Sequence, residues 1–186
     1  MATASGHTPL PGFESPAVGF DSPFEMLEAC HERVQRTLNL LVRLESHVQL
    51  HGCDDQARQA AQDVMRYFDL AAPLHHEDEE LHVFPAVLAR GDGALASAVK
   101  QLIAQHRQME VAWATLRDAL SELVCTGSSQ KTPPVALRAD AIATFMSMYE
   151  GHIRLEEDVV YPAANSLLDL VEKQDMGVDM KTRRGA

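Results

Sequence analysis

Residues 75–87 read HHEDEELHVFPAV, and residues 152–164 repeat the same pattern as HIRLEEDVVYPAA. In each stretch a histidine is followed by two consecutive glutamates four and five positions later, and then by an aromatic residue, a proline and an alanine. A histidine and a glutamate four positions apart project from one face of a helix. The two stretches therefore predict two helices that each present a histidine and a glutamate side by side.

The apolar residues on either side of these stretches recur at spacings of three, four and seven, which is typical of amphipathic helices. Glycine-containing segments at 51–55, 90–93 and 126–129 divide the pattern into four long helical segments. No segment alternates for long with the period of two that a strand requires. The sequence therefore predicts an all-α fold, an up-down-up-down four-helix bundle over residues 22–173.

Both ends of the chain differ from this pattern. Residues 1–21 are rich in glycine, proline and serine and are expected to form a flexible arm, whereas residues 174–186 are expected to form a frayed tail. Within the bundle, Pro73 is expected to kink the second helix without ending it, because the apolar stripe continues in phase. Thr132 is a candidate N-cap of the fourth helix.

Composition excludes several classes of protein. The 186 residues carry a formal net charge of −11, which argues against the basic face that nucleic-acid binding needs. The longest apolar runs are too short to span a bilayer. The first residues lack the charged start and apolar core of a secretory signal, so we expect a cytoplasmic protein. The three cysteines form no C-x-x-C pair, so neither a cysteine zinc site nor a disulfide framework is indicated.

Polar residues occupy positions on the predicted apolar stripes of all four helices. Burying several carboxylates without partners is costly, so either their pKa values rise or a cation lies among them. Counting from each turn, at about 1.5 Å of rise per residue, places these residues within roughly one helical turn of a common depth. The residues concerned are His31, His75, Glu79, His106, Glu110, His152 and Glu156.

The chemistry of this layer predicts a metal site. Histidine nitrogens and carboxylate oxygens without a thiolate suit iron, manganese or zinc. Two H-x-x-x-E pairs and one histidine from each remaining helix supply four histidines and two glutamates. If both glutamates bridge two metals, each metal receives about four protein donors and keeps room for a solvent bridge and an open position. This arithmetic favours a dinuclear site over a mononuclear one.

Taken together with CHERV at 30–34 and AQHRQ at 104–108, the two repeated stretches resemble the hemerythrin-like HHE cation-binding proteins over roughly residues 24–172. The resemblance implies a four-helix bundle with a non-haem centre of two oxo- or hydroxo-bridged iron ions, for which zinc or manganese are possible substitutes. By position in the family's motifs, the resemblance implies that the metal ligands are His31, His75, Glu79, His106, His152 and Glu156.

The third helix departs from the oxygen-carrying members, which have H-x-x-x-H where this chain has His106-x-x-x-Glu110. Glu110 is either a ligand in place of that histidine or an acid that hydrogen-bonds a ligand histidine. As a ligand it would favour the oxidised iron pair and argue against reversible oxygen carriage. His76, Glu80 and Tyr149 are candidates for residues that do not bind the metal but surround and contact its ligands. The simpler interpretations are a solvated face for His76 and Glu80 and core packing for Tyr149.

The resemblance supports a cytoplasmic protein that binds or senses oxygen, nitric oxide or peroxide, or that handles iron. The alternative is an enzyme that repairs iron–sulfur clusters or decomposes peroxide under oxidative or nitrosative stress. Repair proteins of this family commonly carry a cysteine-bearing N-terminal segment, and residues 1–21 contain no cysteine. A ferritin-like oxidase would show Glu-x-x-His instead. We expect no nucleic-acid or membrane partner, and the sequence leaves open a homodimer.

Overall fold

A computed structural model describes residues 18–125 and 137–185, and nearly all of them are helical. The prediction of an all-α fold is confirmed for these residues, which contain no strand. Helix runs through them in five stretches. These are α1 (Pro23–His51); α2 (Asp55–Arg66), α3 (Ala72–Asp78) and α4 (Phe84–Arg90) in one continuous run; α5 (Gly93–Cys125); α6 (Ala139–Leu155) with α7 (Tyr161–Leu167); and α8 (Leu170–Arg183).

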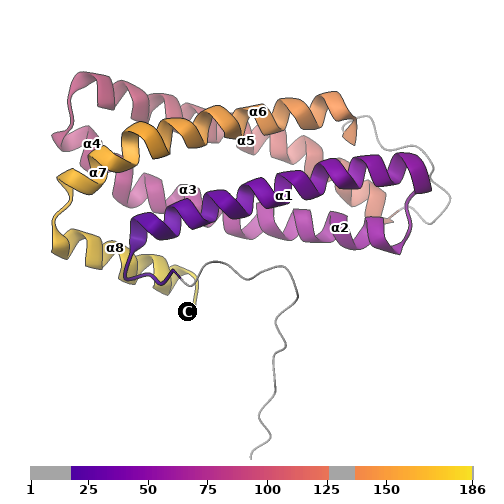
Figure 1. Ribbon diagram of the computed structural model, residues 1–186, viewed down its shortest axis with the longest axis horizontal. Helices are drawn as coiled ribbons and strands as arrows, with labels where there is room; N and C mark the ends of the chain where they lie inside the picture. Colours follow the sequence, from indigo (N-terminus) through magenta and orange to yellow (C-terminus); the bar gives the residue numbers. More distant parts are fainter. Residues whose placement is uncertain (1–17, 126–136, 186) are drawn as a thin grey trace, which may run out of the picture.

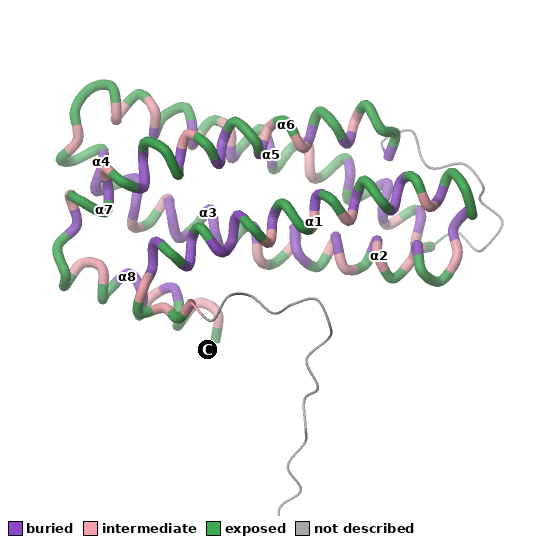
Figure 2. Tube along the Cα trace, viewed as in Figure 1, coloured by how far each residue is buried: buried purple, intermediate pink, exposed green. Residues whose placement is uncertain are grey.

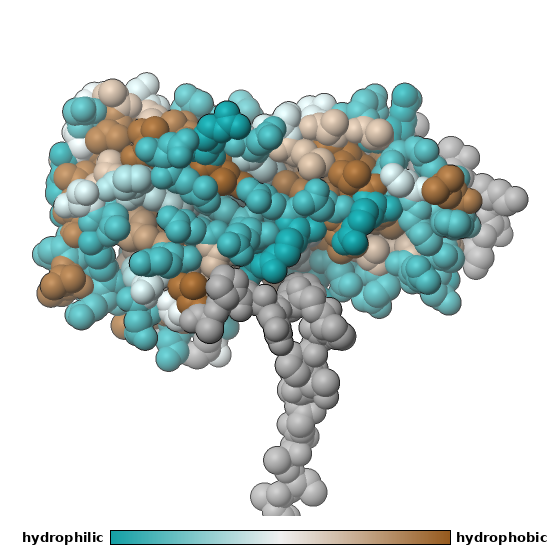
Figure 3. All heavy atoms as spheres, in the orientation of Figure 1, coloured by the Kyte–Doolittle hydropathy of each residue, from teal (hydrophilic) through white to brown (hydrophobic). Residues whose placement is uncertain are grey.

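The four longest stretches lie lengthwise beside one another (Figure 1). Helix α1 contacts both α2 and α6, and α5 contacts the same two helices from the other side. Their buried faces turn toward one another and their exposed faces turn outward (Figure 2). The surface in Figure 3 is mainly hydrophilic, with apolar residues in separate patches. Among the described residues, no helix combines the length and apolar character that crossing a lipid bilayer requires.

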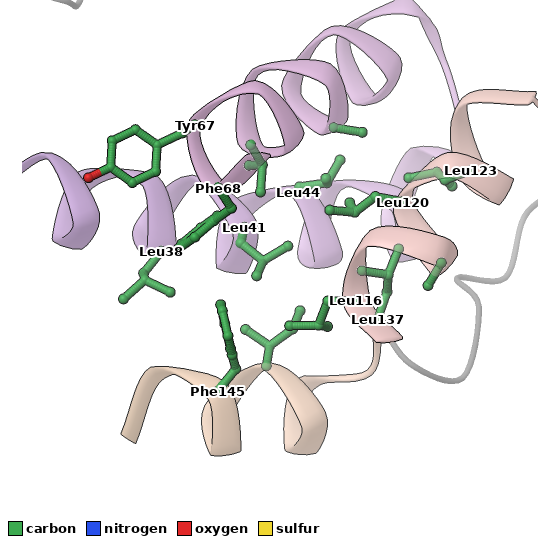
Figure 4. Close-up of a cluster of buried hydrophobic side chains, with 14 of the residues drawn as sticks. Leu38, Leu41, Leu44, Tyr67, Phe68, Leu116, Leu120, Leu123, Leu137 and Phe145 are labelled. Atoms are coloured by element: carbon green, nitrogen blue, oxygen red, sulfur yellow. The ribbon is translucent and has the colours of Figure 1, made fainter. Parts of the chain in front are cut away.

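The buried apolar side chains of residues 18–125 and 137–185 form two clusters. The first includes Leu41 and Leu44 from α1, Leu116 and Leu120 from α5, and Phe145 from α6, which converge in Figure 4. The second, toward the α8 end of the molecule, includes Phe24, Leu27, Val83, Phe84, Leu102, Val160, Met176 and Met180. Burial of each such side chain contributes about 1.5 to 3 kcal/mol relative to exposure. The polar residues predicted on the helix stripes are therefore expected to lie between these two apolar clusters.

In the described part of the chain, three π-helical turns interrupt the α-helices, each directly before an X-Pro pair. They are η1 (Tyr67–Ala71), η2 (Glu79–Val83) and η4 (Glu156–Val160). The residue preceding each proline donates its backbone N–H to the carbonyl five positions back. A proline inside an α-helix lacks an N–H and clashes with the carbonyl four positions back, and the wider turn accommodates both defects. The helix therefore continues past Pro73, as the unbroken stripe predicts.

The π-turn at 156–160 also corrects the predicted stripe of the fourth segment. The spacing rule places Val159, Ala163 and Leu167 in the core, but Val159 is 40% exposed. The buried residues are those one position later, namely Val160, Ala164 and Leu168. A π-turn inserts one residue into the helical period, so every side chain beyond it is displaced by one position around the axis.

The prediction of a frayed tail is wrong for residues 174–183, which belong to α8. Asp169 caps this helix in a reciprocal pair of hydrogen bonds with Glu172. Met176 and Met180 are buried against α1 and its neighbours. Most of the predicted arm, residues 1–17, lies outside the described residues, as does Thr132.

Helix α8 is fastened by charge as well as by apolar contact. Asp78 of α3 has no exposed surface, and its carboxylate accepts hydrogen bonds at 2.5 Å from both Arg183 and Arg184. Burial raises the pKa of Asp78, while the two guanidinium groups oppose that rise. Removing one partner of a buried ion pair is strongly destabilising. The position of α8 is therefore coupled to the helix that also carries His75.

We predict that Gly177→Ala destabilises the protein, although alanine is the better helix former. A Cβ atom at Gly177 would lie 2.1 Å from the backbone oxygen of Phe20, so one of the two segments must move. The free energy of unfolding is expected to fall by about 1 to 3 kcal/mol in chemical denaturation. The matched control is Gly151→Ala in α6, where nothing lies within 4 Å. This control should gain roughly 0.5 to 1 kcal/mol, and equal gains in both variants would contradict the prediction.

Candidate metal centre

Six of the seven polar residues predicted on the stripes meet in the interior, and each is at most 2% exposed. They come from α1, from α3 and the start of η2, from α5, and from α6 and the start of η4. Their donor atoms form two groups, within each of which all atoms lie within 4.8 Å of one another. The first group is His31, His75, Glu79 and Glu156, and the second is Glu79, His106, His152 and Glu156.

The Nε2 atoms of the four histidines face the two shared carboxylates. His31 Nε2 lies 3.2 Å from Glu156 Oε2, and His152 Nε2 lies 2.9 Å from Glu156 Oε1. Glu79 is approached by His75 Nε2 at 3.6 Å and by His106 Nε2 at 3.4 Å. Each glutamate is thus placed between a histidine of one group and a histidine of the other.

The opposite nitrogens of three of these rings are held by acceptors. The Nδ1 atom of His31 lies 2.8 Å from Glu157 Oε1, and that of His106 lies 2.9 Å from Glu80 Oε1. His152 Nδ1 lies 3.0 Å from the side-chain oxygen of Gln105. These contacts favour the tautomer with the proton on Nδ1, which turns the Nε2 lone pair toward the cluster.

The second glutamate of each repeated stretch therefore has a defined position. Glu80 belongs to the first half of the chain and holds His106 of the second half. Glu157 belongs to the second half and holds His31 of the first. The repetition of Glu-Glu in both stretches thus produces two reciprocal contacts between the halves.

Several buried polar atoms of the cluster, His75 Nδ1 among them, lack a hydrogen-bond partner within the described residues. Glu79 Oε2 and both carboxylate oxygens of Glu156 form no hydrogen bond within the described residues. The Nε2 atoms of His106 and His152 lie 3.1 Å apart. Two donors bound to one small cation have a separation of about 3 Å, and buried acceptors that face one another are costly without positive charge between them. The donor set therefore fits two metal cations that share Glu79 and Glu156.

Residues 22–164 match the hemerythrin HHE cation-binding domain family. The chain belongs to this family. An uncharacterised protein of Haemophilus influenzae is 32% identical over 165 residues, which cover 89% of this chain and 91% of that protein. An uncharacterised protein of Mycobacterium tuberculosis is 26% identical over 187 residues, which cover 95% of this chain and 68% of that protein. Family membership and the two donor groups together indicate metal binding.

Tyr161 is a member of the hemerythrin-type site that the sequence analysis missed. Its hydroxyl donates a hydrogen bond to Glu79 Oε1 and lies 3.3 Å from His31 Nε2. Its ring stacks on His31 with an interplanar angle of 8°. Burial raises the pKa of Tyr161 well above its usual value, and the charges of Glu156 and Glu79 raise it further. Tyr161 therefore remains a neutral donor, and the repeated aromatic position before proline was the signal for it.

Glu110 does not lie on the buried stripe, and that expectation is wrong. The residue is exposed, and Met109 beside it is buried instead. Its carboxylate pairs with Arg107, which in turn lies 2.6 Å from Glu80. The sequence left open whether Glu110 is a metal ligand or hydrogen-bonds a ligand histidine. The structure places it outside both donor groups. It lies instead at the outer end of a chain of ion pairs that runs through Arg107 and Glu80 to His106.

The three outer candidates have different surroundings. Glu80 contacts His106 directly, as expected of a residue that supports a ligand. Tyr149 packs against Phe68 and Phe145 in the first apolar cluster. The interpretation of His76 as part of a solvated face is wrong, because the side chain is buried and its ring stacks on His106.

Two histidines of the cluster differ in their affinity for protons. Burial lowers the pKa of His31, but the neighbouring Glu156 carboxylate and the hydrogen bond with Glu157 outweigh this effect and raise it to about 9. Burial dominates at His75 and lowers its pKa to about 3, although the charge of Glu79 opposes the fall. In the metal-free protein at neutral pH, His75 is therefore a neutral imidazole with a free lone pair. His31 is an imidazolium, and a cation must displace its second proton before it can bind the ring nitrogen.

We predict that Glu80→Ala and Glu157→Ala each weaken metal binding about 10- to 100-fold, because each removes the acceptor that orients a ligand histidine. Competition with a chromophoric chelator measures the affinity. Glu150→Ala on the exposed side of α6 is the matched control and should bind as the parent protein does. Glu110→Ala should also retain the parent affinity within a few-fold, and a loss as large as that of Glu80→Ala would restore Glu110 as a ligand.

We also predict that metal affinity rises with pH. Below the raised pKa of His31 a bound proton competes with the cation, so affinity should fall about tenfold for each unit of pH lowered between about pH 8 and pH 6. Zinc is a suitable probe because it does not change oxidation state. Chelator competition at several pH values gives the slope, and an affinity independent of pH would contradict the prediction.

Proposed function

We propose that this chain is a cytoplasmic, non-haem di-iron protein that folds as an up-down-up-down four-helix bundle and binds or senses oxygen, nitric oxide or peroxide. One observation carries the proposal: two buried donor groups share Glu79 and Glu156. Two shared carboxylates are the arrangement that holds two cations a short distance apart. A mixed set of imidazole and carboxylate ligands without thiolate suits iron and also accepts zinc or manganese.

The protein would position the metals, supply negative charge to them and exclude water from the site. His31 and His75 would hold one metal, His106 and His152 the other, and Glu79 and Glu156 would contribute two negative charges to both. Bound iron would supply the change of oxidation state and an open position for a small ligand. The apolar clusters on either side exclude bulk water from the layer, which strengthens the electrostatic interactions inside it.

Tyr161 is the group in this site best placed to act on a bound small molecule. Its hydroxyl lies at the His31 side of the cluster and remains protonated at neutral pH. In the metal-free protein it donates to Glu79, and a ligand oxygen or nitrogen atom would compete for the same proton. Such a donor stabilises a small ligand that gains negative charge when it binds to a reduced metal.

A second candidate function is an enzyme that decomposes peroxide. It is favoured by a pocket of about 480 Å³ that opens between η1 and α3 on one side and α5 on the other, and that reaches His76 beside the cluster. A route of this size would admit substrate and release product repeatedly. Iron handling and a role in iron–sulfur repair use the same centre, and no separate feature of the described residues favours them.

The test is metal analysis of protein from iron-supplied cells, with optical spectra before and after reduction. We expect about two irons per chain and charge-transfer bands that disappear on reduction. Oxygen, nitric oxide and peroxide are then added to the reduced protein. A reversible adduct supports carriage, a stable change of state supports sensing, and continued consumption of peroxide supports the enzyme.

The proposal would be overturned by a protein that binds one metal or none after iron loading. The double variant Glu79→Ala/Glu156→Ala should lose both irons. The control is His47→Gln, which changes a histidine of α1 that lies 16 residues beyond His31 and pairs with Asp54, and it should keep both irons. Equal iron content in the two variants would show that the metal is bound elsewhere.

A further inference from the structure

His76 is a buried histidine beside the cluster that the proposed function does not use. Its side chain is 8% exposed. The ring stacks on His106, with 3.9 Å between the centroids and an interplanar angle of 9°. A neutral imidazole offers a nitrogen lone pair that a metal cation can use.

The nitrogen atoms of His76 lie within reach of the second donor group. One nitrogen each from His76, His106 and His152 lies within 4.8 Å of the other two. His106 and His152 belong to the group that also contains Glu79 and Glu156. A cation held by His106 and His152 would therefore have His76 as a neighbour on the same side.

Without His76 the two donor groups are alike, because each has two histidines and both share Glu79 and Glu156. The group at His31 has two histidines, and the third helix offers only His106 because Glu110 turns to the surface. His76 supplies from the second helical stretch the additional donor that the third lacks. With it, one group has two histidines and the other has three.

His76 also lines the pocket between η1, α3 and α5. Most of the other lining residues are apolar, including Phe68, Leu81, Met109 and Trp113. None of the other histidines of the cluster lines this pocket. His76 therefore lies between the solvent-accessible pocket and the second donor group.

We propose that His76 is a third histidine ligand of the metal held by His106 and His152, and that the pocket gives small neutral molecules access to this coordination position. The proposal rests on the proposed function only in requiring that the wild-type protein binds two metals at the cluster. It does not depend on which gas or peroxide the centre meets.

The experiment compares His76→Ala with the wild-type protein, using cobalt(II) as the probe metal because its visible spectrum reports coordination number and donor type. We expect the wild-type protein to bind two cobalt ions and the variant to bind one of them at least tenfold more weakly, with a changed visible spectrum. Added imidazole should restore the second ion and the spectrum, because it can enter through the pocket and occupy the vacated position.

Two control variants separate coordination from packing. His82→Ala removes a half-buried histidine that pairs with Asp179, away from the cluster, and should match the wild-type protein. His152→Ala removes a ligand that does not line the pocket, so imidazole should not restore its loss. Circular dichroism establishes that each variant keeps the wild-type helix content.

The outcomes distinguish this proposal from the proposed function. Failure of the wild-type protein to bind two metals would overturn both. Two metals in the wild-type protein and an unchanged affinity and spectrum in His76→Ala would overturn only the role of His76. A loss in His76→Ala that imidazole does not restore would assign the effect to stacking on His106 and would also overturn the proposal.

Discussion

The structure depends on the burial of two carboxylates, Glu79 and Glu156, between two apolar clusters. Three of their four oxygens have no hydrogen-bond donor among the described residues, and four imidazoles face them. An apolar interior tolerates such charge only when positive charge lies beside it. In the metal-free protein the proton on His31 provides part of that charge, and the remainder is the driving force for binding cations.

The two halves of the chain are joined through this layer. Glu80 holds His106 and Glu157 holds His31, so each half orients a histidine of the other. Neither half alone contains a complete donor group, because both groups include residues from before and after the α4–α5 turn. Metal binding is therefore coupled to the packing of all four long helical stretches, as it is in other proteins whose ligands come from distant segments.

The π-turns of the backbone around the site determine which side chains face the cluster. Two of the π-turns begin at the shared glutamates, and each is followed by a proline that an α-helix would not accommodate. The additional residue in each turn changes the direction of the side chains that follow, which brings Tyr161 onto His31 and Phe84 onto His106. Helix α8 closes the same end through the buried Asp78, one residue before Glu79.

The sequence by itself determined the all-α class, the identity of six buried polar residues and their common depth, because helical periodicity and rise are local properties. Tertiary structure alone decided the rest. Whether Glu110 or Met109 faces the core depends on the rotation of α5 against its neighbours, and the burial of His76 depends on α5 covering it. The position of α8 depends on a buried aspartate about a hundred residues earlier in the chain, and the register beyond Glu156 depends on a π-turn. The first three of these are set by contacts between distant segments, which no periodicity along one helix records. The π-turn accompanies a local X-Pro pair, and the spacing rule of a regular α-helix does not allow for its additional residue.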